Sequence, residues 1–114
     1  MLHEMMLTPR PFAMIEAGVK TIELRLNDEK RQAIKVGDWI CFYCTEDHSH
    51  ILQAEVVGLH YFDDFAKLYQ ALPLEKCGYR NEELALARPE DMEQYYSKEQ
   101  QAQYGVVGIE LRLC

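Results

Sequence analysis

The chain has 114 residues, of which 48% are hydrophobic and 11% aromatic, so it can bury a core of its own as one domain over residues 1–114. This composition excludes an intrinsically disordered chain. The formal net charge of −7 argues against a broad basic surface for long duplex nucleic acid, while a local basic patch stays compatible with it.

The first half of the chain reads as strands around one short helix. A short apolar run at residues 3–7 predicts an opening strand, and apolar residues at helical spacing over residues 12–18 predict a helix that ends at a glycine. The alternating residues 20–26, KTIELRL, predict a second strand. A polar connection follows at residues 27–32, and residues 38–44, DWICFYC, predict a third strand.

In the next part of the chain the spacing of the apolar residues changes from that of a strand to that of a helix. Residues 45–50 are predicted as a polar turn, and residues 51–62 as a long strand in which Gly58 indicates a bulge or bend. From Phe62 to Leu72 apolar residues recur at three- and four-residue spacing, which predicts an amphipathic helix.

The last part predicts more helix and a final strand. Residues 84–96 read as helix interrupted near Pro89, the capping-box spacing of residues 97–100 starts another short turn, and residues 104–113 close the chain as a strand. This order predicts an α+β fold, in which about five or six mostly antiparallel strands form a small closed or half-closed β-barrel with flanking helices.

The pentapeptide IELRL occurs twice, at residues 22–26 and 109–113. Strand alternation puts its apolar residues on one face and its two charges on the other. For the second copy this predicts an ordinary core strand with Glu110 and Arg112 toward water. The first copy has a different setting, because Gly18 and Lys20 precede it and a charge-rich stretch follows.

Charge is distributed unevenly along the chain. Residues 20–35 contain five cations and three acids, whereas the remainder contains seven cations and sixteen acids. Two interpretations fit this small excess: a charge-rich surface turn, or an anion-attracting mouth on an otherwise acidic body.

The string Gly18-Val19-Lys20-Thr21-Ile22-Glu23-Leu24-Arg25 resembles the G-x-K-x-x-E-x-R motif of the ASCH domain family (activating signal cointegrator-1 homology). Three further places are similar to that family: Pro11-Phe12 with Ile15, Gly37-Asp38 before a strand, and Tyr104-Gly105-Val106-Val107. The resemblance covers nearly the whole chain as a single ASCH-like domain. It implies a PUA-like β-barrel with a cleft beside the motif, and an association with RNA or nucleotide recognition.

Within this resemblance, Lys20, Glu23 and Arg25 are the predicted ligand-binding residues, with Lys30 and Arg31 as phosphate contacts at the rim. The Arg25 guanidinium is a planar fork of donors, Lys20 is a mobile cation, and Glu23 orients the guanidinium or accepts from an exocyclic amine. The expected partner is RNA, single-stranded nucleic acid or a nucleoside derivative. The competing interpretation is an exposed ion pair of little energetic consequence.

An enzymatic alternative comes from the same family. One branch removes acetyl groups from N4-acetylcytidine with a K-x-x-T-x-R motif, in which a lysine activates a threonine and a glutamate comes from elsewhere in the chain. Here Glu23 stands where that threonine belongs, so catalysis would use Lys20 with Glu23 or Thr21. Candidates for the distant glutamate are Glu75, Glu82 and Glu83.

A third class of function is a protein-interaction module, with the acidic helices between Asp63 and Tyr96 as its docking surface. We expect no metal and no cofactor: Cys41 and Cys44 have C-x-x-C spacing with His48 and His50 nearby, but their odd separation in a strand sends the sulfurs to opposite faces.

Aromatic residues are assigned mainly to the core. Of Trp39, Tyr43, Tyr61 and Phe62, about one is expected to face the cleft as a stacking surface, while the helical Phe65 and Tyr69 are expected to pack inside. No secretory signal or membrane span is evident in the sequence. We therefore expect a cytoplasmic protein with reduced cysteines and no membrane partner.

Overall fold

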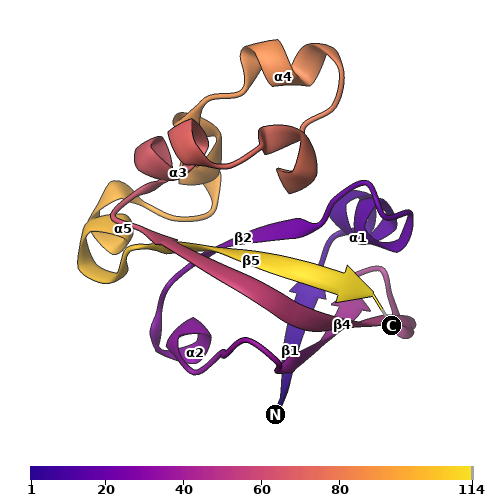
Figure 1. Cartoon of the computed structure of the whole chain (residues 1–114). Coiled ribbons are helices and arrows are strands. Elements are labelled where there is room, and N and C mark those ends of the chain that lie inside the picture. Colours follow the sequence, from indigo (N-terminus) through magenta and orange to yellow (C-terminus); the bar gives the residue numbers. More distant parts are fainter. Residues whose placement is uncertain (114) are drawn as a thin grey trace.

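The computed structural model describes residues 1–113, so Cys114 lies outside the described part of the chain. Five strands form one sheet, which curls into a half-barrel (Figure 1). They are β1 (Leu2–Leu7), β2 (Ile22–Leu26), β3 (Trp39–Cys44), β4 (Asp47–Phe62) and β5 (Val106–Leu113). Their order across the sheet is β1-β3-β4-β5-β2, which makes β1 and β2 the two edges. The predicted α+β barrel-like class is confirmed.

The sheet is mixed, because β1 runs parallel to β3 while the other three pairings are antiparallel. A parallel pair needs a crossover connection. After β1 the chain crosses to the far edge, where it forms β2, and only then returns to lay β3 beside β1. The short connections in the sequence predicted antiparallel pairing and gave no indication that β1 pairs with β3 in parallel.

Strand β4 begins earlier than the sequence predicts. The predicted polar turn at residues 45–50 is wrong for residues 47–50, since Asp47 already pairs with Cys44 and only Thr45 and Glu46 make the turn. Both faces of this hairpin end are exposed, so its strand residues carry no apolar alternation. The predicted irregularity at Gly58 is confirmed by a register shift between Val56 and Gly58.

Helical segments cover the sheet. They are α1 (Pro9–Glu16), α2 (Glu29–Gln32), α3 (Phe65–Ala71), η1 (Leu74–Cys77), α4 (Glu82–Leu86), η2 (Pro89–Gln94) and α5 (Lys98–Tyr104). Those between β4 and β5 form a layer beside β2 (Figure 1). The predicted capping box is confirmed, because Ser97 Oγ accepts from Gln100 N and Gln100 Oε1 accepts from Ser97 N. Within residues 1–113, no helix is both long and apolar enough to cross a membrane.

Two predicted boundaries need correction. Within the predicted polar connection 27–32, α2 forms one helical turn because the Asp28 side chain accepts from Arg31 N. The interruption expected near Pro89 within residues 84–96 is confirmed, but the two elements have other bounds: α4 begins at Glu82 and η2 ends at Gln94. Proline lacks the N–H that a continuing helix would use.

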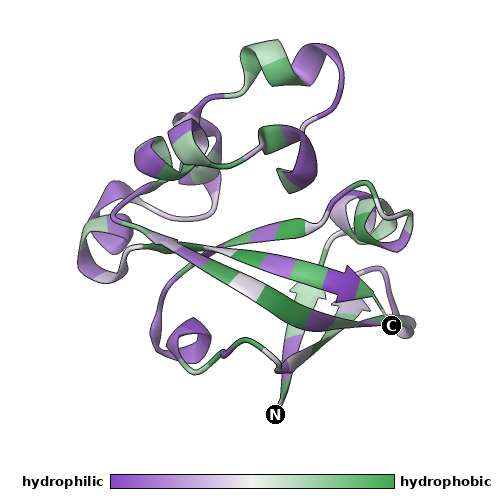
Figure 2. Cartoon of the chain, viewed as in Figure 1, coloured by the Kyte–Doolittle hydropathy of each residue, from purple (hydrophilic) through white to green (hydrophobic). Residues whose placement is uncertain are grey.

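Two hydrophobic clusters form the core, and β5 contributes residues to both. One fills the half-barrel and includes Phe12, Ile40, Phe42, Val56 and Ile109. The other joins β2 to the helical layer and includes Ile22, Leu24, Leu26, Phe65 and Leu68. The strands accordingly alternate between apolar and polar residues (Figure 2). The apolar residues of β2 pack in the second cluster only. On the other face of β2 Glu23 is also buried, at 4% exposure, so its charge does not point to water.

The two IELRL copies meet in the sheet, where Ile22 lies opposite Glu110 and Glu23 opposite Ile109. The charges of the second copy form surface pairs, Glu110 with His60 at 2.8 Å and Arg112 with Glu55 at 2.5 Å. The expectation of an ordinary core strand for this copy is confirmed.

We predict that Ile109→Ala lowers the free energy of unfolding by about 2–5 kcal/mol, because Ile109 is fully buried in the half-barrel and truncation leaves a cavity. Ile51→Ala is the matched control: this side chain is 46% exposed, and its loss should cost less than about 1 kcal/mol. Urea denaturation of both variants measures the difference. Equal losses would contradict the position of the core.

Candidate ligand site

The turn after α1 delivers Lys20 to the start of β2. Gly18 adopts a left-handed φ of 79°, a conformation that glycine reaches without steric cost. The amides of Val19 and Lys20 both donate to the Met14 carbonyl, which closes the turn. The next amide, Thr21 N, donates to Lys76 O at 2.9 Å and so ties the motif to η1.

Glu23 is the buried centre of the motif, with only 4% of its surface exposed. Its two carboxylate oxygens are held by two different cations: Lys20 Nζ lies 2.9 Å from Oε1, and Arg25 Nε lies 2.7 Å from Oε2. The side chains of Lys20 and Arg25 are themselves only 11% and 14% exposed. The three predicted residues therefore form one ion cluster, with an excess of one positive charge.

Arg25 also links the two edges of the sheet. Its Nη2 donates to the carbonyl oxygen of Met6 at 2.9 Å, so a side chain of edge strand β2 reaches the main chain of edge strand β1. The Glu23 contact fixes the orientation of the guanidinium at its other side. One planar group thus serves both the half-barrel and the ion cluster.

The charge state of Glu23 follows from its neighbours. Burial alone would raise the pKa of Glu23, but the charges of Lys20 and Arg25 and their hydrogen bonds outweigh it and hold this pKa below its ordinary value. The carboxylate is therefore ionised at neutral pH. A carboxylate held in this way is a weak base.

A cavity of about 540 Å³ opens over this cluster. Its floor includes Lys20, Glu23 and Arg25, and the helical layer contributes the opposite wall. Four tyrosines line that wall: Tyr69, Tyr79, Tyr95 and Tyr96. Cys77 also lines the cavity, and burial raises its pKa to about 11, so its thiol is neutral. The cavity thus combines aromatic surface with a charged floor.

Two of the wall tyrosines form a hydrogen-bonded chain. Tyr79 donates to Asp91 Oδ2 at 2.8 Å, and the hydroxyls of Tyr69 and Tyr79 lie 2.6 Å apart. Since the carboxylate can only accept, Tyr79 gives its one proton to Asp91 and Tyr69 donates to Tyr79. Burial raises the pKa of Tyr69 to about 12, so this hydroxyl stays protonated.

The other residues predicted from the sequence lie elsewhere. Thr21 is not among the residues that line the cavity, and its main chain carries the contact to η1. Lys30 and Arg31 lie on α2, also away from the lining, with Arg31 paired to Asp28 at 3.2 Å. Of the three candidate distant glutamates, Glu83 lines the cavity.

Sequence reasoning missed most of the aromatic wall. Tyr79, Tyr95 and Tyr96 were not singled out, and Tyr69, expected in the core, is both 9% exposed and part of the lining. These tyrosines lie on or beside several short helical elements and are not regularly spaced in the sequence. No sequence pattern therefore indicates that they share one cavity wall. The capping-box position of Asp91 was the one local signal nearby.

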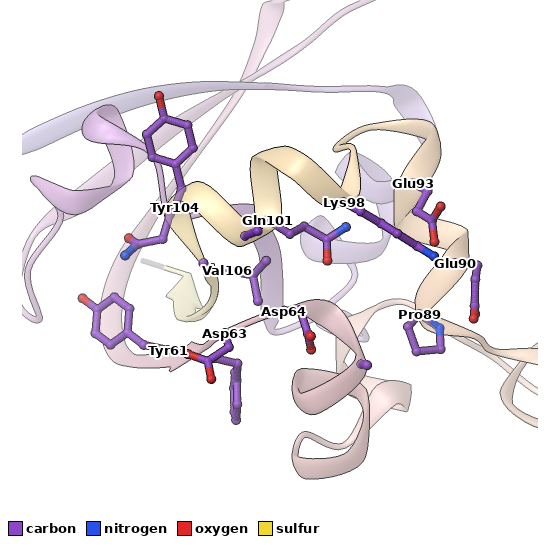
Figure 3. A pocket seen from close by; sticks show the side chains of 15 residues that line it. Tyr61, Asp63, Asp64, Pro89, Glu90, Glu93, Lys98, Gln101, Tyr104 and Val106 are labelled. Atoms are coloured by element: carbon purple, nitrogen blue, oxygen red, sulfur yellow. The ribbon is translucent and has the colours of Figure 1, made fainter.

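A second cavity, of about 780 Å³, is lined by residues of β4, η2 and α5, among them Tyr61, Glu90 and Gln101 (Figure 3). Tyr61 and Phe62, two of the aromatics considered for stacking, line this one. Its charged lining is mainly acidic: Asp63, Asp64, Glu90 and Glu93, with Lys98 as the cation. It contains no residue of the motif and would repel phosphate, so the smaller cavity is the candidate site.

These features define the class of protein. It has a curled mixed sheet, and the edge of this sheet carries a buried lysine–glutamate–arginine cluster that faces a tyrosine-lined cavity. The ASCH domain model matches residues 5–114. The chain therefore belongs to the ASCH domain family, which is generally associated with RNA, and the resemblance noted in the sequence is confirmed.

Solved structures agree with this membership. The crystal structure of hypothetical protein PH0355 is 31% identical over 100% of both chains, with a TM-score of 0.84. Protein PF0455 from Pyrococcus furiosus, solved by NMR, is 30% identical over 99% of this chain and 97% of its own, with a TM-score of 0.72. ASCH from Zymomonas mobilis shares the fold at 16% identity, with coverage of 97% and 66% and a TM-score of 0.68. No curated protein matches the chain.

We predict that Glu23→Gln lowers the free energy of unfolding by about 3–5 kcal/mol, because it leaves two cations close together without their carboxylate. Glu110→Gln is the matched control, since it changes the same position of the second IELRL copy in a half-exposed pair, and it should cost at most about 1 kcal/mol. Chemical denaturation at pH 7 checks both. Similar losses would show that Glu23 is an ordinary surface charge.

The same pair of proteins makes a pH prediction. A carboxyl whose folded pKa lies below its unfolded value stabilises the fold above the unfolded pKa and loses that contribution as pH falls through the folded pKa. The stability difference between the natural protein and Glu23→Gln should therefore shrink as pH falls below the ordinary value of 4.5. Denaturation curves between pH 7 and pH 3 measure it, and a difference that grows at low pH would contradict the lowered pKa.

Proposed function

We propose that this protein binds an unpaired nucleotide of RNA, or a free nucleoside derivative, in the cavity over Lys20, Glu23 and Arg25. The observation that carries the proposal is the pairing of this buried ion cluster with a wall of tyrosines across a cavity of about 540 Å³. Ligand cavities have volumes of roughly 300–1,000 Å³ and combine apolar lining with a few fixed polar groups. Membership of the ASCH family supports the same class of ligand.

The chemistry of the cavity suits a nucleobase. Aromatic side chains stack on base faces, and Tyr95, 65% exposed, is the most accessible of those that line the cavity. Lys20 Nζ pairs with Glu23 Oε1 at 2.9 Å, and its ammonium group carries two further N–H donors. They can donate to base carbonyl or ring nitrogen acceptors. The oxygens of Glu23 keep lone pairs that accept from an exocyclic amine.

A concave site of this kind favours a base that is not stacked in a helix. Sequence-specific RNA recognition mostly uses unstacked bases of loops and single strands, which can turn outward into a pocket. The net charge of −7 opposes a long phosphate backbone lying over the rest of the surface. Both considerations favour a short single-stranded or nucleoside-sized ligand over duplex RNA.

Binding fits the geometry better than the hydrolytic alternative. Removal of an acetyl group through a covalent step needs an activated hydroxyl. Thr21 is outside the cavity lining, and Glu23 is held by two cations with a lowered pKa, which weakens it as a base for water. Incubation with N4-acetylcytidine tests this preference: we expect no release of acetate, and release that stops in Lys20→Met would establish the amidohydrolase instead.

We predict that Tyr95→Ala weakens binding of a single-stranded RNA decamer by about five- to a hundred-fold, the effect of losing one stacking contact. Tyr61→Ala, a similarly exposed tyrosine at the other cavity, should leave affinity unchanged. Fluorescence anisotropy with labelled RNA measures both, and a duplex of the same sequence should bind more weakly than the single strand. Equal losses in the two variants would place the ligand outside the proposed site.

We also predict that Lys20→Met lowers affinity and reduces the dependence of binding on salt, because it removes a cation from the floor of the cavity. Lys67→Met is the control: Lys67 is exposed, on α3, paired with Asp63 and not among the lining residues. Anisotropy titrations at several salt concentrations compare them. Unchanged RNA binding in Lys20→Met would place the RNA outside this cavity.

A further inference from the structure

Arg10 lies at the mouth of the candidate site, where the sequence offered no motif for it. It lies on α1 and lines the cavity together with Lys20 and Arg25. Its side chain is 64% exposed, whereas the two cations of the floor are nearly buried. The cavity therefore has a buried cationic floor and a separate, solvent-accessible cation at its mouth.

In this structure the Arg10 guanidinium is occupied by a carboxylate of the same chain. Its Nη2 lies 2.7 Å and 2.8 Å from the two oxygens of Glu83, which is on α4. Within residues 1–113 this is the one ion pair that joins α1 or the strands before β4 to the helical layer. In Figure 1, α4 lies at the top of the helical layer and α1 lies below it, beside the start of β2. The pair thus spans the mouth of the cavity.

Apart from Arg10, the Glu83 carboxylate has one other hydrogen bond among the described residues: its Oε1 accepts from Arg80 N at 3.1 Å, within the same exposed segment. None of the residues of α4 is buried, and the preceding residue, Asn81, has a positive φ of 53° and makes no side-chain cap. The Glu83 side chain is 42% exposed. An exposed ion pair contributes only about 0–1 kcal/mol, so another anion can replace Glu83 at little cost.

We propose that Arg10 recognises a phosphate of the ligand, and that Glu83 occupies Arg10 as a built-in competitor in the free protein. A guanidinium pairs with phosphate through the same planar fork that it presents to a carboxylate. The base then lies over the cluster of the floor while its phosphate takes the place of Glu83. This rests on the proposed function and narrows it: the preferred ligand is a nucleotide rather than a bare nucleoside.

Isothermal titration calorimetry with the four ribonucleosides and their 3′- and 5′-monophosphates tests the inference. The natural protein should bind at least one monophosphate about ten-fold more tightly than its nucleoside, and Arg10→Gln should abolish that preference. Glu83→Gln should tighten monophosphate binding about two- to five-fold and leave the nucleoside unchanged. In the Arg10→Gln background, Glu83→Gln should not change monophosphate binding, because the guanidinium for which Glu83 and the phosphate compete is then absent.

Other outcomes are distinguishable. Equal affinity for nucleosides and monophosphates in all variants would overturn the role of Arg10 while the proposed function stands. A phosphate preference that survives Arg10→Gln would move the phosphate to Lys20 and also overturn it. Absence of binding by every nucleoside and monophosphate would overturn this inference, and a lack of RNA binding as well would remove the proposed function. Unfolding curves establish that each variant is folded.

Discussion

The buried carboxylate of Glu23 is the constraint around which this molecule is arranged. A lone buried carboxylate is costly, and a protein that keeps one ionised must surround it with cations and donors. Lys20 reaches it from the turn before β2, and Arg25 reaches it along the strand. Arg25 then bonds to Met6 on the opposite edge of the sheet. Arg25 thus helps to satisfy the charge through one nitrogen and links the two edges of the half-barrel through another.

This arrangement explains why a cavity forms at the edge of the sheet. A side chain, rather than a continuous ladder of main-chain hydrogen bonds, joins β1 and β2, and β2 packs its other face against the helical layer. Side chains from the sheet edge and from that layer therefore converge on one space. Because the two sides come from different layers, the cavity has a charged floor and an aromatic wall, a combination that suits the nucleobase proposed as its ligand.

The repeated pentapeptide shows how far local sequence can be trusted for function. Both copies form strands with the same alternation, and they lie side by side in the sheet. Glu110 and Arg112 pair with separate surface partners, whereas Glu23 and Arg25 pair with each other under a cover of other elements. Identical residues therefore have different energetic and chemical roles, and what differs is the burial of the face on which they lie.

The sequence by itself determined the strands with clear alternation, the bulge at Gly58 and the capped start of α5. It also determined the cluster of Lys20, Glu23 and Arg25. Each of these features depends on contacts within a few residues or on a motif in one strand. Only the tertiary structure decided the parallel pairing of β1 and β3, the tyrosine wall and the position of Arg10 at the mouth. These features bring together residues far apart in the chain. No local period or spacing encodes such a meeting, since packing of the layers alone decides which distant side chains share a cavity.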